Sequence, residues 1–62
     1  MPLYKVGDWV RFIGTPSAFA GQIIELRGKL GPGGAEVYRI KFARTLHLDA
    51  WEDQLEPTSG GE

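Results

Sequence analysis

Four titratable residues lie close together near the end of this chain: His47, Asp49, Glu52 and Asp53. A histidine beside carboxylates is a combination that general acid–base catalysis uses. On a strand, however, residues two apart are separated by roughly 7 Å, so we expect no direct hydrogen bond between the side chains of His47 and Asp49. We interpret the group as a solvated acidic edge, and we expect no catalytic residues.

The chain has no cysteine and a single histidine. Disulfides and thiolate metal sites are therefore excluded, and one imidazole cannot build a histidine-based metal site. The glycine-rich segment 28–35 lacks the Gly-x-x-x-x-Gly-Lys-Ser/Thr spacing of a phosphate-binding loop, and we expect no helix after it. The segment is typical of a hairpin loop. We expect neither a metal nor a cofactor.

The large apolar residues exceed what a domain of 62 residues needs for its core. A barrel of this size seldom encloses two indoles, so we expect Trp9 or Trp51 to be partly exposed, and exposed aromatic residues often mark interfaces. Ile13 extends an apolar stretch onto a second face. Phe19, in the loop of residues 14–20, either caps the barrel or makes an exposed contact. We take Trp9, Ile13, Phe19 and Trp51 as candidate partner-binding residues, the partner being another protein or a second copy in a homo-oligomer.

The net charge of −1 is unevenly distributed. Residues 49–62 hold five acidic residues and no basic one, whereas the central part of the chain is rich in lysine and arginine. Domains that bind duplex nucleic acid usually carry a marked positive excess, so the overall balance argues against that role. Arg39, Lys41 and Arg44 are expected to form a basic strip that would suit an acidic partner or RNA.

Short apolar stretches bounded by turn-forming residues predict five strands and one helical turn. The strands are expected at residues 9–13, 22–27, 37–42, 45–48 and 55–57, with the helical turn at 51–54 just before the last strand. Residues 14–20 contain Thr-Pro-Ser and predict an irregular loop. Strands this short bury a core only by curling together, so we expect an all-β, five-stranded small barrel over residues 1–57 and a flexible tail over 58–62.

Alternation along the predicted strands indicates which residues face the core. Val10 and Phe12 share one face of the first strand, and Tyr38, Ile40 and Phe42 share one face of the third. In the second strand two isoleucines, at positions 23 and 24, are adjacent. That pair predicts either a β-bulge or burial on both faces.

Two further features concern membranes. No apolar run approaches the roughly 20 residues that span a bilayer, and the first residues lack the apolar core of a signal peptide. We therefore expect a cytoplasmic protein with no membrane partner.

Several short motifs resemble those of SH3-like small β-barrels, which include KOW and Tudor-type domains. The motifs are Gly7-Asp8-Trp9-Val10-Arg11, Gly21-Gln22-Ile23, Tyr38-x-Ile40-x-Phe42 and Leu55-Glu56-Pro57. The resemblance covers about residues 5–57 and implies the barrel fold. It does not define a function, because many unrelated activities use this barrel.

A closer resemblance is to the plasmid-borne type B, trimethoprim-resistant dihydrofolate reductases. They share the Gly-Asp-x-Val-Arg and Gly-Gln-Ile motifs, a Pro32-Gly33 loop and the closing Leu55-Glu56. The resemblance implies a homotetramer with a central pore, in which a Val-Gln-Ile-Tyr strand binds NADPH and dihydrofolate. Here the corresponding segment reads His-Leu-Asp-Ala over residues 47–50, without the glutamine or the tyrosine. Under this alternative, the pore would be lined by Thr45, Leu46, His47 and Leu48.

Three functions follow from the sequence. The favoured one is a small non-catalytic SH3-like module that self-associates or docks on a protein partner. The first alternative is a reductase-like homotetramer that uses NADPH and dihydrofolate. The second is a weak RNA-binding module of the KOW or Tudor type.

Overall fold

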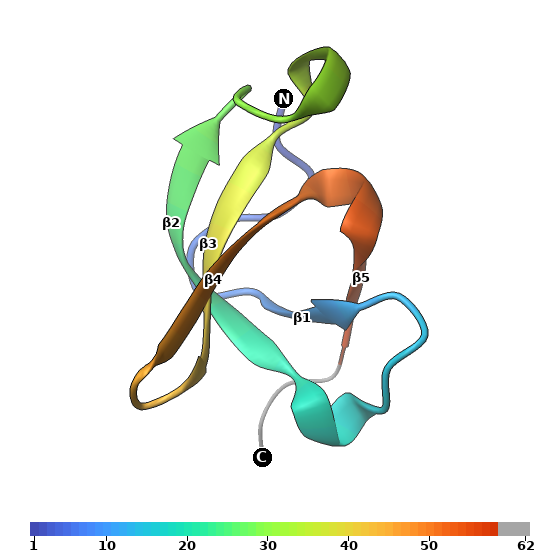
Figure 1. Ribbon diagram of the computed structural model, residues 1–62, viewed down its shortest axis with the longest axis vertical. Coiled ribbons are helices and arrows are strands. Elements are labelled where there is room, and N and C mark those ends of the chain that lie inside the picture. The colour runs from blue at the N-terminus through green and yellow to red at the C-terminus, as the bar shows by residue number, and fades with distance from the viewer. Residues whose placement is uncertain (59–62) are drawn as a thin grey trace.

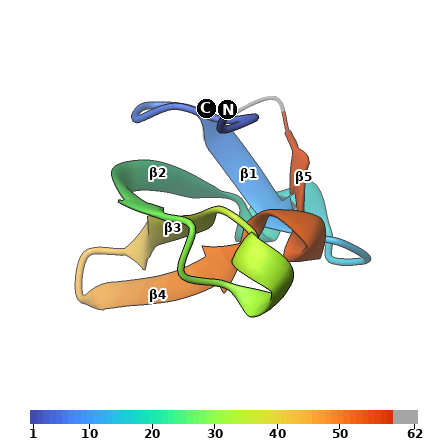
Figure 2. The same ribbon diagram turned by 90° about the horizontal axis from the view of Figure 1, so that it is seen from above.

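The computed structural model describes residues 1–58 and shows five antiparallel strands in one sheet (Figure 1). The strands are β1 (Trp9–Phe12), β2 (Gly21–Gly28), β3 (Val37–Ala43), β4 (Leu46–Trp51) and β5 (Leu55–Pro57). Their order across the sheet is β4-β3-β2-β1-β5, so that β1 pairs with both β2 and β5. The sheet is strongly bent, as Figure 2 shows from above. It encloses one cluster of buried apolar side chains. The protein therefore has the all-β, five-stranded small-barrel fold that the sequence predicts.

The core takes residues from every strand and from the segment before β1. Two further side chains, Phe12 and Phe42, pack against it and stack on each other with ring centroids 5.6 Å apart. The predicted inward faces of β1 and β3 are thus confirmed. The buried set comprises Tyr4, Val10, Ile23, Tyr38, Ile40, Ala50 and Leu55.

One end of the barrel is closed by the segment before β1. The Tyr38 hydroxyl donates a hydrogen bond of 2.5 Å to Glu52 Oε2 and lies 3.1 Å from the Leu3 backbone N–H, which also donates to Glu52. Burial, followed by the hydrogen bond to Glu52, raises the pKa of Tyr38 to about 12. The same hydrogen bond, with that from Leu3, lowers the pKa of Glu52. This network fixes the N-terminal segment against the turn before β5.

Three short 3-10 turns connect the strands: Ser17–Phe19, Pro32–Gly34 and Glu52–Gln54. The last confirms the predicted helical turn before β5, although it begins one residue later than expected. The first shows that the expectation of a wholly irregular 14–20 loop was wrong. Its turn is closed by hydrogen bonds from the Phe19 and Ala20 N–H groups to the Pro16 and Ser17 carbonyls.

Strand four is the largest departure from the predicted boundaries, because it runs over Leu46–Trp51 instead of 45–48. Its register explains the difference. Ala50 pairs with Tyr38 and Trp51 pairs with Val37, so β4 continues along the full length of β3. Trp51 therefore ends a strand and does not begin the helical turn.

Two other sequence-based interpretations are resolved. In β2 the register shifts between Ile23 and Glu25, Ile23 is buried, and Ile24 is 37% exposed. The bulge is therefore present, and burial on both faces was wrong. Thr58, the first residue of the expected flexible tail, donates a backbone hydrogen bond to the Trp9 carbonyl. The rest of that tail, 59–62, lies outside the described residues. Within residues 1–58, no helix is long and apolar enough to cross a membrane.

Candidate binding surfaces

The four predicted contact residues do not form one surface. Ile13 and Phe19 are 60% and 63% exposed, so the interpretation of Phe19 as a cap of the barrel was wrong. Trp51 is partly exposed and packs beside Gly31, at the end of the sheet where β3 begins. Trp9 is half-buried on the outer face of β1. Two separate hollows, one beside Phe19 and one beside Trp9, are the candidate sites.

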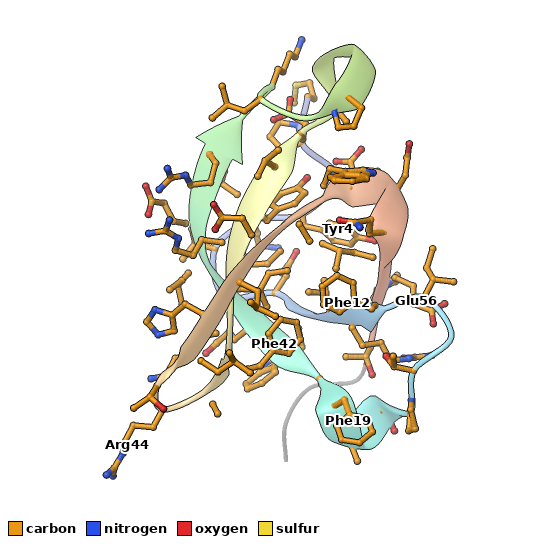
Figure 3. All side chains as sticks on the ribbon, in the orientation of Figure 1. Tyr4, Phe12, Phe19, Phe42, Arg44 and Glu56 are labelled. Atoms are coloured by element: carbon orange, nitrogen blue, oxygen red, sulfur yellow. The ribbon has the colours of Figure 1, made fainter. Side chains whose placement is uncertain are left out.

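The first hollow, which we call the apolar groove, has a volume of about 310 Å³. It lies between the 3-10 turn that carries Phe19 and the hairpin that joins β3 to β4. Figure 3 shows Phe12 and Phe42 inside the barrel and Phe19 below them. Within the part of the chain that the structure describes, the lining contains no charged side chain: it consists of Phe12, Thr15, Ala18, Phe19, Phe42, Leu46 and Leu48.

The groove exists because the inner face of β4 extends past the core. Leu46, Leu48 and Ala50 alternate along β4 and share one face. Ala50, opposite Tyr38, is 2% exposed, whereas Leu48 and Leu46 are 41% and 46% exposed. β4 stands at the edge of the sheet, so no other strand of residues 1–58 covers the two leucines. The two leucines point to the same side of the sheet as the core residues, but they remain partly exposed.

The second hollow, which we call the basic hollow, has a volume of about 340 Å³ and opens on the outer face of the sheet. Trp9 pairs with Gln22, Gln22 with Lys41, and Lys41 with His47, so these four residues form a row across β1 to β4. Residues directly opposite one another on neighbouring strands share a face. The lining formed by the described residues contains no acidic side chain: it consists of Trp9, Ala20, Gln22, Lys41, Phe42, Ala43 and Arg44.

Only two of the three residues of the predicted basic strip line the basic hollow, and the third, Arg39, is paired with an acidic residue. Arg39 Nε lies 3.0 Å from Asp49 Oδ1 across the β3–β4 pair, and this hydrogen bond lowers the pKa of Asp49. The charge of Arg39 is therefore largely offset by its neighbour. Lys41 and Arg44 are both exposed and both line the basic hollow. Figure 3 shows Arg44 projecting from the β3–β4 turn.

Two of the four residues that first suggested acid–base chemistry are engaged elsewhere. Asp49 pairs with Arg39, and Glu52 accepts hydrogen bonds from Tyr38 and Leu3. No cluster of three or more histidine or acidic residues that could hold a metal is found within residues 1–58. The arrangement favours structural roles for both carboxylates.

The four residues proposed to line a pore are divided between different sides of the chain. Leu46 and Leu48 line the apolar groove, His47 lies on the opposite face of β4, and Thr45 lies in the turn before it. Sequence reasoning did not identify the two leucines together with Phe12 and Phe42 as one surface. The alternation Leu46-x-Leu48-x-Ala50 is the signal that could have indicated it.

Together, the fold and these surfaces define a small all-β barrel with two hollows, each large enough for a small ligand, one apolar and one basic. Comparison with known proteins does not narrow this class, because no family model, curated protein or solved structure matches the chain.

Proposed function

We propose that this chain is a small non-catalytic assembly module, and that its partner is a second copy of itself, joined through the edge of β4. The observation that carries the proposal is the exposure of Leu46 and Leu48 on the inner face of an edge strand. Such residues gain free energy when a partner covers them, because apolar burial contributes about 25 cal/mol per Å².

The two edges of the sheet differ in how well they are protected. β5 has only three residues and ends in Pro57, and short edges that contain proline resist pairing with another chain. β4 has six residues and contains neither proline nor lysine. Its free backbone groups and its apolar side chains therefore favour the addition of another strand at this edge.

The sequence of β4 is complementary to itself in an antiparallel, two-fold arrangement. If the pair is centred on Leu48, that residue meets its own copy, and Leu46 of one chain lies opposite Ala50 of the other. On the outer face, His47 lies opposite Asp49. Apolar residues thus face apolar ones, and an imidazole that can donate a hydrogen bond faces a carboxylate, as an isologous interface requires. This complementarity is the reason for choosing a second copy over an unrelated protein.

The small core supports the same conclusion. Only seven apolar residues of the described chain are buried. Domains of this size have a narrow stability margin, and oligomerisation is one common way to increase it.

The test is sedimentation velocity over a wide range of protein concentrations, with two matched variants. Leu48→Lys places a charge at the centre of the pairing and should give a monomer. Ile24→Lys, at a residue of similar exposure on β2, should leave association unchanged. Circular dichroism checks that both variants fold. A wild-type protein that stays monomeric at every concentration would overturn the proposal, and so would equal association of the two variants.

A charge-based variant tests the register. His47→Asp should weaken association, because it places two acidic residues opposite each other at each end of the pair. The double exchange His47→Asp with Asp49→His should restore part of the loss. Failure of the exchange to recover any association would exclude the register centred on Leu48.

A further inference from the structure

The basic hollow holds most of the unpaired positive charge of the described chain. Within residues 1–58, the ion pairs engage Lys5, Arg11, Arg27 and Arg39. Of the remaining basic side chains, Lys41 and Arg44 both line the basic hollow, and only Lys29 lies elsewhere. Among residues 1–58, no acidic side chain lines the hollow to offset them. The site is therefore prepared for an anion.

An aromatic surface lies beside these two cations. Trp9 is half-buried on β1, and its backbone is held on both sides, by pairing with Gln22 and by the hydrogen bond from Thr58. The indole is thus carried by a strand and not by a loop. An indole positioned in this way offers a face on which a planar ring can stack, and such stacking is how proteins bind the bases of single strands.

An amide completes the site between the aromatic ring and the cations. The Gln22 side chain lies in the row between Trp9 and Lys41, and its Nε2 donates a hydrogen bond of 3.2 Å to the Gly7 carbonyl. That bond fixes the amide through one of its two N–H donors. The Gln22 Oε1 atom then serves as an acceptor for an N–H group on the edge of a base.

We propose that the basic hollow binds a nucleoside phosphate, with the base stacked on Trp9 and the phosphate between Lys41 and Arg44. Its volume of about 340 Å³ lies in the range of small-ligand sites. An acidic peptide would satisfy the two cations but has no planar ring for the indole. The ligand is either a free nucleotide or one unit of a single-stranded nucleic acid, which present the same chemistry.

The test measures binding by fluorescence in a Trp51→Phe background, where Trp9 is the only indole. Three probes are compared at low salt: a purine mononucleotide, a short single-stranded RNA and polyglutamate of matched charge. Quenching by the mononucleotide identifies a free nucleotide as a sufficient ligand, and quenching by RNA alone identifies the polymer. Quenching by neither, or equal binding of polyglutamate, would overturn the proposal.

Variants separate the stacking contribution from the charge contribution. Lys41→Ala with Arg44→Ala should weaken binding and, for RNA, reduce the slope of log affinity against log salt by about 0.7, since each neutralised phosphate contributes about 0.7 for a single strand and the two cations share one phosphate. The control Arg27→Ala with Lys29→Ala removes the same charge outside the hollow and should leave the slope nearly unchanged. Equal effects of the two double variants would show that binding is only a general response to charge.

The aromatic contribution is measured by anisotropy of a labelled probe. Trp9→Ala should weaken binding about fivefold or more, which is the lower end for loss of one stacked base. Trp9→Phe keeps a ring and should retain much of the affinity, which separates stacking from any loss of folding. Unchanged affinity in folded Trp9→Ala would exclude the stacked base. The proposal is independent of self-association, because Leu48→Lys alters the inner face and should leave mononucleotide binding intact.

Discussion

Gly21 is the position where the smallest change should have the most informative effect. An added Cβ at this buried residue would lie 2.6 Å from Ile40 Cγ2 and 2.7 Å from Phe42 Cδ1. Its φ angle lies outside the left-handed region, so an alanine meets no conformational strain there. Any cost of Gly21→Ala is therefore steric, and it arises from the close approach of β2 to the side chains of β3.

The expected cost follows from overpacking of a close-packed core. Inserting one methyl group where neighbours cannot move freely costs about 1–3 kcal/mol. For a domain of this size, that cost lowers the melting temperature by roughly 4–24 °C. We expect urea and thermal unfolding of Gly21→Ala to show losses of unfolding free energy and melting temperature in these ranges. The slope of the unfolding free energy against urea concentration should not change.

A double-mutant cycle distinguishes steric overlap from a general loss of stability. Phe42→Leu removes the Cε1 atom, which lies 2.9 Å from the added Cβ, so it should relieve part of the Gly21→Ala cost. The control is Gly14→Ala, which has nothing within 4 Å of its added Cβ but a φ of +89°. It should cost about 1–2 kcal/mol from backbone strain and show no coupling to position 42. A Gly21→Ala protein as stable as the wild type, or additive with Phe42→Leu, would refute the reasoning.

Three further predictions concern the core and its network. Tyr38→Phe should cost about 1–2 kcal/mol by removing the hydroxyl that joins Glu52 to the N-terminal segment. Because the folded pKa of Tyr38 is raised from 10.0 to about 12, wild-type stability should fall as the pH rises between these values, and the fall should be smaller in Tyr38→Phe. Because the folded pKa of Glu52 is lowered, the stability that Glu52 contributes is present above about pH 4.5 and is lost on further acidification. In Glu52→Gln, the free energy of unfolding measured in urea should therefore fall less steeply as the pH is lowered below that value. Ile23→Thr should destabilise the protein far more than Ile24→Thr. The second variant should change the free energy of unfolding by less than about 0.5 kcal/mol. Comparable effects of the two substitutions would contradict the bulge.

The sequence predicts the strands best where one face is uniformly apolar. In β3 the residues Tyr38, Ile40 and Phe42 alternate with polar ones, and both the strand and its inward face are confirmed. β4 is harder to predict because its inner face changes from leucine to alanine. Ala50 is buried by its pairing with Tyr38, and that pairing depends on a register between strands that local periodicity does not determine.

The candidate surfaces depend even more strongly on contacts between distant residues. Arg39 and Asp49 are ten positions apart, and only the β3–β4 register shows that they pair and remove one charge from the basic strip. The sequence left two positions open for Phe19, as a cap of the barrel or as an exposed contact, and only the 3-10 turn that carries it shows that its side chain is exposed. Trp9 was identified as an interface candidate, but its position in one row with Lys41, on the far side of Gln22, depends on two successive strand pairings.

Self-association through β4 and nucleotide binding in the basic hollow together predict how the length of an RNA should affect its affinity. Antiparallel pairing of two β4 strands about a two-fold axis keeps equivalent side chains on the same side of the joined sheet. The two basic hollows would then open on one continuous face, each reached from β4 through the row from His47 to Trp9. An RNA long enough to reach both should bind more tightly than two independent short strands, because the second contact is intramolecular.

This length dependence should disappear when the pairing is broken. In Leu48→Lys the short RNA serves as an internal reference, because it occupies one hollow in either protein. We expect the ratio of long-strand to short-strand affinity, measured by anisotropy, to be high in the wild type. In the variant the ratio should be lower, because a long strand then gains only from the larger number of positions at which one hollow can bind it. The same ratio in both proteins would mean that the two hollows do not act on one strand, even if each binds a nucleotide.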